Sequence, residues 1–140
     1  MKEYPKKFIY GRVFRVKTKN SNFSKKYLNV SFYQFGLKAL EHGKIRLHNI
    51  NAITRLIKKT FKKELKVRYN ISLVTPITRK PTEARMGKGK GARVFWEFTV
   101  KKGFILLEVG GFVSKIRLFR CLNLINEKLP VSTKIVKLTY

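Results

Sequence analysis

The chain has 140 residues, with 33 Lys or Arg against 7 acidic residues, so its formal net charge is +26. Such an excess of positive charge repels itself unless a polyanion neutralises it, and nucleic acid is the natural counterion. The 44% of hydrophobic residues exclude a disordered polycation and predict one compact domain, the single cysteine excludes an intramolecular disulfide, and no apolar run approaches the roughly 20 residues of a membrane span.

Residues 1–29 are expected to form a basic arm ahead of a domain over residues 30–140. The arm interleaves basic residues with aromatics, and we expect it to take up its structure on RNA, with Lys6, Lys7 and Arg12 among its contacts. The alternative is an edge strand over residues 8–16. The arm lacks the long apolar centre of a secretory signal and the Arg/Ser bias of a transit peptide, so we expect it to belong to the mature protein.

Residues 30–39 favour a strand that is broken at Gly36, and His42 with Gly43 marks a turn before residues 45–47. A helix is predicted over residues 49–65, with Asn49 as its N-cap and isoleucines at offsets of three and four as its core face. Its opposite face is cationic and is either a phosphate-binding surface or simply solvated. The lysines of that face are Lys58, Lys59, Lys62 and Lys63.

A strand is predicted over residues 67–74, and the stretch KPTEARMGKGKG follows at residues 80–91. Its glycines leave main-chain N–H groups free to approach a phosphate, and its lysines supply neutralising charge. A solvated flexible loop is the other interpretation.

Two strands over residues 94–100 and 104–109, joined by residues 101–103, have the signature of a hairpin and are expected to pair. The aromatic residues Phe95, Trp96 and Phe98 could stack on bases, but their place in a β-rich run favours core packing. A second helix follows, capped by Ser114 and extending to residue 128, with Cys121 as a small buried hydrophobe, and then a strand over 132–138. These elements predict an α+β domain with a mixed or antiparallel sheet and two helices.

Enzyme chemistry finds no support in the sequence. The glycine-rich stretch matches neither G-x-G-x-x-G nor a P-loop, the carboxylates are scattered, and a lone thiol on a helical apolar stripe is a core residue far more often than a nucleophile. With two histidines and no Asp, a metal site is not expected. We therefore predict no catalytic residue, cofactor, metal, small-molecule substrate or membrane partner.

Several blocks between residues 30 and 136 stand in the order of one known family. They are Val30-Ser31-Phe32, Phe35-Gly36-Leu37-Lys38-Ala39, Thr75-Pro76-Ile77-Thr78, Lys80-Pro81, Arg85-Met86-Gly87-Lys88-Gly89-Lys90-Gly91, Trp96, Gly103, Glu108 with Gly110 or Gly111, Lys128-Leu129-Pro130 and Thr133-Lys134. With these blocks the chain resembles the L-sixteen family of large-subunit ribosomal proteins, in its bacterial and organellar form.

The resemblance implies a hammerhead-like β-motif and a place in the large ribosomal subunit beside the aminoacyl-tRNA site. There the protein would bind large-subunit rRNA, help to position tRNA and contact neighbouring ribosomal proteins. Carried over by motif, the residues from Arg85 to Gly91 would reach into RNA, with Arg79, Lys80 and Arg93 at their base.

The sequence departs from the family in the arm, which gains aromatic residues, and in the second helix, which is usually rich in alanine. Lys outnumbers Arg by 23 to 10, a bias typical of A/T-rich codons. We therefore expect an organelle-encoded protein of the mitochondrion, with a plastid or the bacterial cytoplasm as alternatives. The alternative function is a free-standing basic nucleic-acid-processing enzyme or RNA-binding factor.

Overall fold

The computed structural model describes residues 28–71, 75–87 and 89–138. This part of the chain forms seven strands and two helices, which confirms the α+β prediction. The strands are β1 (Phe35–Ala39), β2 (Gly43–Arg46), β3 (Lys66–Tyr69), β4 (Thr75–Arg79), β5 (Ala92–Val100), β6 (Ile105–Gly110) and β7 (Thr133–Lys137). The helices are α1 (Leu47–Phe61) and α2 (Lys115–Lys128).

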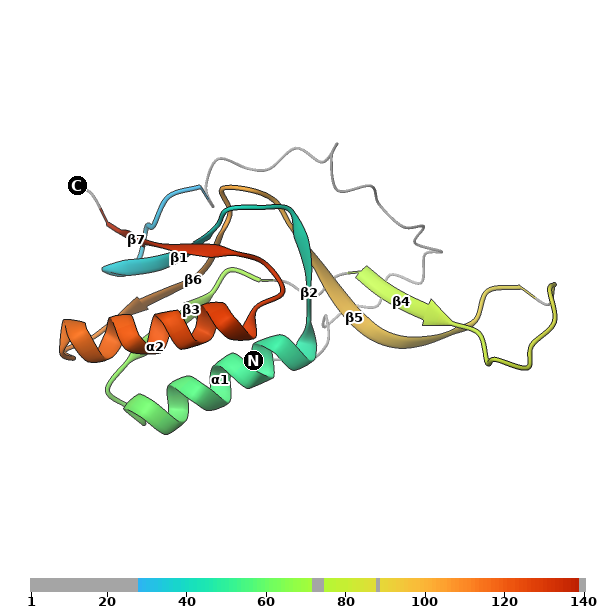
Figure 1. Cartoon of the computed structure of the whole chain (residues 1–140), viewed down its shortest axis with the longest axis horizontal. Coiled ribbons are helices and arrows are strands. Elements are labelled where there is room, and N and C mark those ends of the chain that lie inside the picture. The colour runs from blue at the N-terminus through green and yellow to red at the C-terminus, as the bar shows by residue number, and fades with distance from the viewer. Residues whose placement is uncertain (1–27, 72–74, 88, 139–140) are drawn as a thin grey trace.

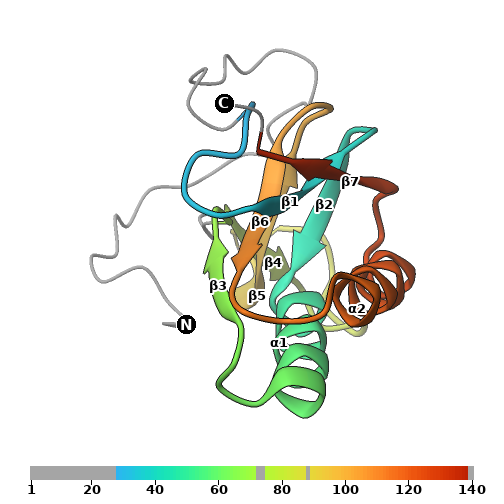
Figure 2. The ribbon, with the colours of Figure 1, turned by 90° about the vertical axis from the view of Figure 1, so that its left-hand side faces the viewer.

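The strands make two antiparallel sheets, one in the order β3-β6-β1-β7 and the other in the order β2-β5-β4. Helices α1 and α2 lie side by side against the first sheet, as Figures 1 and 2 show from two directions. The second sheet leaves this body at one end, where β4 and the start of β5 project away from everything else (Figure 1). No helix in the described residues is long and apolar enough to cross a membrane.

The apolar stripes of both helices pack into one core with the central strand β6. The buried residues of α1 recur at offsets of three and four, as predicted, and so do those of α2. They are Ile50, Ile53, Ile57 and Phe61 in α1 and Leu118, Cys121, Leu122 and Ile125 in α2. All six residues of β6 are buried, because it has a strand on each side and side chains packed over it.

The predicted pairing of residues 94–100 with residues 104–109 is wrong. Strand β5 pairs with β2 and β4, whereas β6 pairs with β1 and β3, so the two lie in different sheets. Residues 101–103 form a corner at which the chain crosses from one sheet to the other. Gly103, with φ of 89°, donates to the Ala39 carbonyl at 2.7 Å, and Ala39 donates to the Phe104 carbonyl at 2.9 Å. Both edges of β5 are occupied, so β6 finds its partners elsewhere.

Several predicted boundaries also shift. Helix α1 begins at Leu47, so Asn49 lies in its first turn, where its side-chain oxygen accepts from the Arg46 N–H at 3.2 Å, and not at the N-cap. The helix ends at Phe61 because Lys62 takes φ of 51°. Strand β1 starts only at Phe35, and β3 ends at Tyr69, well before the predicted residue 74. Residues 72–74, like residues 1–27 of the arm, lie outside the described part.

Core packing is confirmed for two of the three aromatics of β5. Trp96 is buried and Phe98 packs against the core, whereas Phe95 is half-buried at the surface. Cys121 is buried as predicted, and desolvation raises the pKa of its thiol above the ordinary value, with a hydrogen bond to Thr60 acting in the opposite direction. A neutral, enclosed thiol of this kind is a packing residue.

Glu108 holds the segment before β1 onto the sheet. Its side chain is buried in β6, and Oε2 accepts from three successive main-chain N–H groups, those of Ser31 at 3.2 Å, Phe32 at 2.8 Å and Tyr33 at 3.3 Å. Oε1 accepts from Asn70 Nδ2 at 3.1 Å, which ties in the residue after β3. We call this arrangement the Glu108 clasp.

Two glycines let the clasped segment lie close to the strands. A Cβ at Gly36 would stand 2.8 Å from Val30 Cγ2, and one at Gly110 would stand 2.9 Å from Tyr33 Cδ1. Val30, Gly36, Glu108 and Gly110 all belong to the blocks that carry the family resemblance. All four residues therefore share one structural role, which is to hold the segment before β1 against the first sheet.

Candidate nucleic-acid interface

Strands β4 and β5 form a projecting ribbon with the glycine-rich stretch at its far end (Figure 1). Their register runs from Thr75 opposite Glu97 to Arg79 opposite Ala92, with an irregularity between Ile77 and Thr78. Such a bulge increases the local twist of a ribbon. We call residues 75–97 the finger. It carries the glycine-rich stretch well beyond the body of the domain.

Glycine is required at three positions of the finger tip for two different structural reasons. Gly87 and Gly89 take φ of 99° and 76°, a region that residues with a Cβ enter at a cost. Gly91 lies against the opposite strand, because a Cβ there would stand 2.5 Å from the Arg79 carbonyl oxygen. Lys80 Nζ donates to the Gly87 carbonyl at 2.6 Å and so closes the tip across its width.

The finger concentrates exposed cations. Four predicted contacts, Arg79, Arg85, Lys90 and Arg93, are exposed along it, and Glu83 is the only acidic residue of the tip. Lys80 is exposed as well, although its ammonium group also braces the tip. Residues of the tip line an open hollow of about 460 Å³.

Of two further predicted contacts, Met86 and Lys88, the structure describes only the first. Met86 is fully exposed at the tip. Lys88 lies outside the described residues, between two glycines that are described. No described atom lies within 4 Å of where a Cβ would stand on Gly87 or Gly89, so the described part of the tip has open space beside these two glycines.

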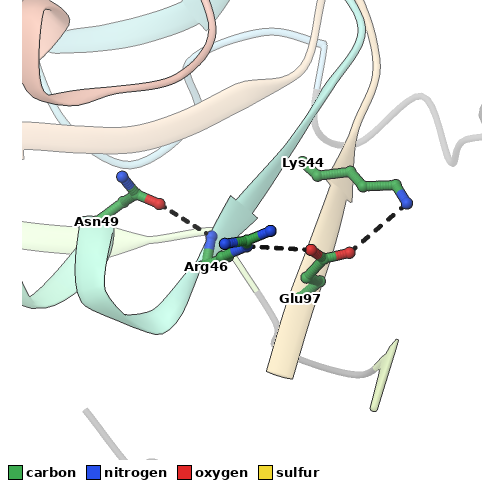
Figure 3. Close-up of polar contacts among 4 residues, drawn as sticks. All are labelled: Lys44, Arg46, Asn49 and Glu97. Atoms are coloured by element: carbon green, nitrogen blue, oxygen red, sulfur yellow. Dashed lines mark hydrogen bonds and ion pairs between the residues drawn. The ribbon is translucent and has the colours of Figure 1, made fainter. Parts of the chain in front are cut away.

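The base of the finger carries a charged cluster that sequence reasoning missed (Figure 3). Glu97 is 6% exposed, its Oε1 lies 3.2 Å from Arg46 Nε, and its Oε2 lies 3.6 Å from Lys44 Nζ. Arg46 also covers the ring of Phe95, at 4.4 Å from its centroid. One buried carboxylate thus orients two cations and leaves the cluster positive. The only signal in the sequence was the alternation of Lys44 and Arg46 in a short strand, which does not identify Glu97 as their partner.

Arg93 is held against an aromatic ring in a similar way, since its guanidinium lies 4.8 Å from the centroid of the Trp96 ring. Stacking of this kind keeps a long side chain from adopting many rotamers. The guanidinium of Arg93 is therefore partly oriented before any ligand binds.

The predicted contacts on α1 do not join those of the finger. Lys58, Lys59, Lys62 and Lys63 are exposed at the C-terminal end of α1, and that end of the helix lies on the opposite side of the body from the finger (Figure 1). The predicted arm contacts Lys6, Lys7 and Arg12 lie outside the described residues. The structure thus separates the described candidate contacts into two basic regions, one at each end of the long axis.

Replacing Gly91 by Ala is expected to open the base of the tip, because the new Cβ would meet main-chain atoms of Arg79 that cannot move independently. Amide hydrogen exchange should accelerate at the end of β4 while the helices keep their protection. The matched control is Thr82→Ala, at an exposed site of the tip. Unchanged exchange in the Gly91 variant would contradict the close approach of the two strands.

Metal chemistry finds no site in the described part of the chain, where no group of three or more His, Cys, Asp or Glu could hold an ion.

Comparison with known proteins matches residues 3–136 to the family described as Ribosomal protein L16p/L10e. The chain is 39% identical over 132 residues to the large ribosomal subunit protein uL16c of Euglena longa, covering 94% of this chain and 96% of that protein. It is 44% identical over 108 residues to the large ribosomal subunit protein uL16 of Orientia tsutsugamushi strain Boryong, covering 77% and 79%. The same protein of Blochmanniella pennsylvanica is 39% identical over 108 residues, covering 77% and 80%.

Proposed function

This chain belongs to the ribosomal protein L16p/L10e family, non-enzymatic structural components of the large ribosomal subunit, and from that premise we propose that its finger binds rRNA beside the aminoacyl-tRNA site and helps to position tRNA. Membership in the family implies rRNA and other ribosomal proteins as partners. The contacts with tRNA and the residues that make them are the part that we propose.

The observation that carries the proposal is the finger itself. It extends beyond the body, presents exposed cations on both strands, and has open space at its tip where a Cβ would stand on Gly87 or Gly89. A ribbon of this shape can enter a crevice between RNA helices that the body could not enter. Its cations would neutralise phosphates on both sides, and Met86 would meet whatever lies at the end of the crevice.

We further propose that the other basic residues make supporting contacts. The exposed lysines of α1 lie at its C-terminal end, where the helix dipole adds no repulsion to a cation, and a phosphate chain could neutralise them together. Residues 1–29 would form a separate basic arm that binds rRNA through Lys6, Lys7 and Arg12. The dense positive charge of that segment supports this role.

For localisation we propose an organelle-encoded protein of the mitochondrial ribosome. The support is compositional, since Lys, Phe, Ile and Asn are abundant and Ala is scarce. The relatives named above come from bacteria and from Euglena, which is compatible with an organellar or a bacterial origin. Sequencing the gene with its flanks decides the matter, and a nuclear or bacterial locus would overturn the proposal.

Crosslinking tests the position of the finger. A photoreactive phenylalanine analogue in place of Met86, in a reconstituted large subunit with tRNA bound at the aminoacyl site, should crosslink to tRNA or to rRNA next to it. The same analogue in place of Leu124, exposed on α2, serves as the control and should give no tRNA adduct. Adducts of the Met86 variant confined to rRNA far from the bound tRNA would contradict a tRNA-positioning role.

Sedimentation separates this function from that of a free-standing RNA-binding enzyme. The protein should migrate with the large subunit at moderate salt, and its affinity for rRNA should fall with salt by a log–log slope of about 0.7 to 0.9 for each phosphate contacted. A protein that runs mostly free, or a shallow salt slope, would argue against a ribosomal RNA-binding role.

A further inference from the structure

A second concave surface lies at the end of the body opposite the finger, where β6 passes into α2 and the chain before β1 crosses it. Its volume is about 540 Å³. We call it the aromatic groove, and the lining residues that matter here are Phe32, Tyr33, Lys63, Lys66 and Phe112. None of these except Lys63 was among the residues predicted to contact RNA.

Two aromatic rings are displayed at this groove. Phe112 is fully exposed and Phe32 is 51% exposed, which is unusual for side chains of that size in a protein with a well-packed core. Arg68 lies over the ring of Phe32, at 3.4 Å from the centroid, and so restrains it. The Glu108 clasp fixes the backbone of Phe32 as well. The ring is thus held in place at the surface.

The position of Phe112 follows from the glycine before it. Gly111 takes φ of 155°, and a Cβ there would stand 2.6 Å from the Glu64 carbonyl oxygen. The connection between β6 and α2 therefore lies directly on the connection between α1 and β3. Phe112 therefore lines the same groove as Lys63 and Lys66, the residues on either side of Glu64 and Leu65.

The rim of the groove is positive. Lys63 and Lys66 are exposed, and neither forms an ion pair with another described residue. Glu64 stands between them, but its carboxylate lies 3.8 Å from the Arg117 guanidinium, which balances its charge. The two lysines therefore offer their charge to a ligand, beside two aromatic faces.

We propose that the aromatic groove binds an unpaired nucleotide of RNA, with the base stacked on Phe112 and Phe32 and the adjoining phosphates on Lys63 and Lys66. Aromatic platforms flanked by cations are the means by which proteins hold single-stranded nucleic acid, since every base has a π-face. A double helix does not fit this role because its bases are already stacked inside. An apolar side chain of a neighbouring protein would use the rings but not the two lysines.

The inference rests on the proposed function in one respect, namely that the chain binds RNA. It adds a site for a single-stranded nucleotide at the end of the molecule away from the finger, with chemistry that the finger lacks. A ribosomal RNA anchored at both ends of the long axis would fix the orientation of the protein, and the groove would supply the second anchor.

Binding of a fluorescent hexa-adenylate to the full chain tests the site, with a six-residue abasic ribose-phosphate oligomer as the companion ligand. Phe112→Ala should weaken hexa-adenylate binding by about 5- to 150-fold, the range for loss of one stacked base, and leave binding of the abasic oligomer unchanged. Phe112→Trp should restore binding and Phe112→Leu should not, which separates stacking from apolar contact. Lys63→Ala with Lys66→Ala should weaken binding of both oligomers.

The controls distinguish a failure of the groove proposal from a failure of the proposed function. Leu124→Ala removes an exposed apolar side chain from α2 outside the groove and should bind both oligomers as the unaltered protein does. If the Phe112→Ala variant binds hexa-adenylate normally, or loses both oligomers equally, the groove does not stack a base and the inference is overturned, whereas the finger and its rRNA contacts are unaffected. If the unaltered protein binds neither oligomer nor rRNA, the proposed function itself fails.

Discussion

Replacing Glu108 by Ala is expected to lower the free energy of unfolding by about 3–5 kcal/mol, because four donors converge on this one buried carboxylate. Each donor left without an acceptor costs about 1–3 kcal/mol where water cannot reach it, and the partly exposed edge of the segment moderates the sum. A loss of this size is a large part of the 5–15 kcal/mol typical of a domain. The segment at residues 30–33 should detach first, because it has no strand partner to replace the clasp.

Urea unfolding followed by circular dichroism measures this change, and two variants serve as controls. Glu108→Gln keeps the shape and one acceptor oxygen but loses the charge that strengthens the bonds, so we expect a smaller loss of about 1–2 kcal/mol. Glu127→Ala removes an exposed carboxylate from α2 and should stay within about 0.5 kcal/mol of the unaltered protein. Equal stability of the Glu108→Ala and Glu127→Ala variants would show that the clasp contributes nothing.

Removing the cations of the finger is expected to have the largest effect on RNA binding. The variant replaces four exposed residues by Ala, namely Arg79, Lys80, Arg85 and Lys90. If each contributes about 1 kcal/mol through a charge-assisted contact, affinity for rRNA should fall on the order of 10³-fold at moderate salt. The log–log salt slope should become shallower by about 3 to 4, since each phosphate contact adds about 0.7 to 0.9.

A matched variant separates local contact from net charge. It also removes four exposed cations, chosen from outside the predicted contacts, namely Lys115, Arg120, Lys134 and Lys137. Filter binding over a series of salt concentrations should show a much smaller change in slope for this variant than for the finger variant. Equal slopes would mean that the overall charge of the protein, and not the finger, determines its affinity.

Local patterns predicted the elements whose formation depends on neighbours along the chain. The offsets of three and four among the isoleucines indicated α1. The predicted cap at Ser114 and end at Lys128 are confirmed for α2. The glycine-rich stretch was identified as well, because Gly87 and Gly89 have a local cause in the sharp return of the chain, whereas Gly91 is required by its close approach to Arg79 on the opposite strand. The role of the cations in that tip remains a prediction that the experiments above address.

Local sequence patterns did not predict the contacts between residues that are far apart along the chain. The hairpin signature at residues 101–103 predicted the wrong partner for β5, because turn chemistry does not say which edges a strand will find occupied. The three main-chain donors of the clasp lie more than 70 residues from Glu108 along the chain, and its fourth donor, Asn70, lies 38 residues away. The pairing of Glu97 with Arg46 and Lys44 likewise depends on the register of two separate strands.

By itself, the sequence determined the charge class of the protein, its α+β composition, its two amphipathic helices and its family, because charge, periodicity and ordered motifs need no knowledge of tertiary contacts. Only the tertiary structure decided which strands pair, that the glycine-rich tip stands on a projecting finger, and that Phe112 and two lysines line one groove at the far end of the body. Burial and register depend on the whole chain closing on itself, so residues distant in sequence acquire a common role only in the fold.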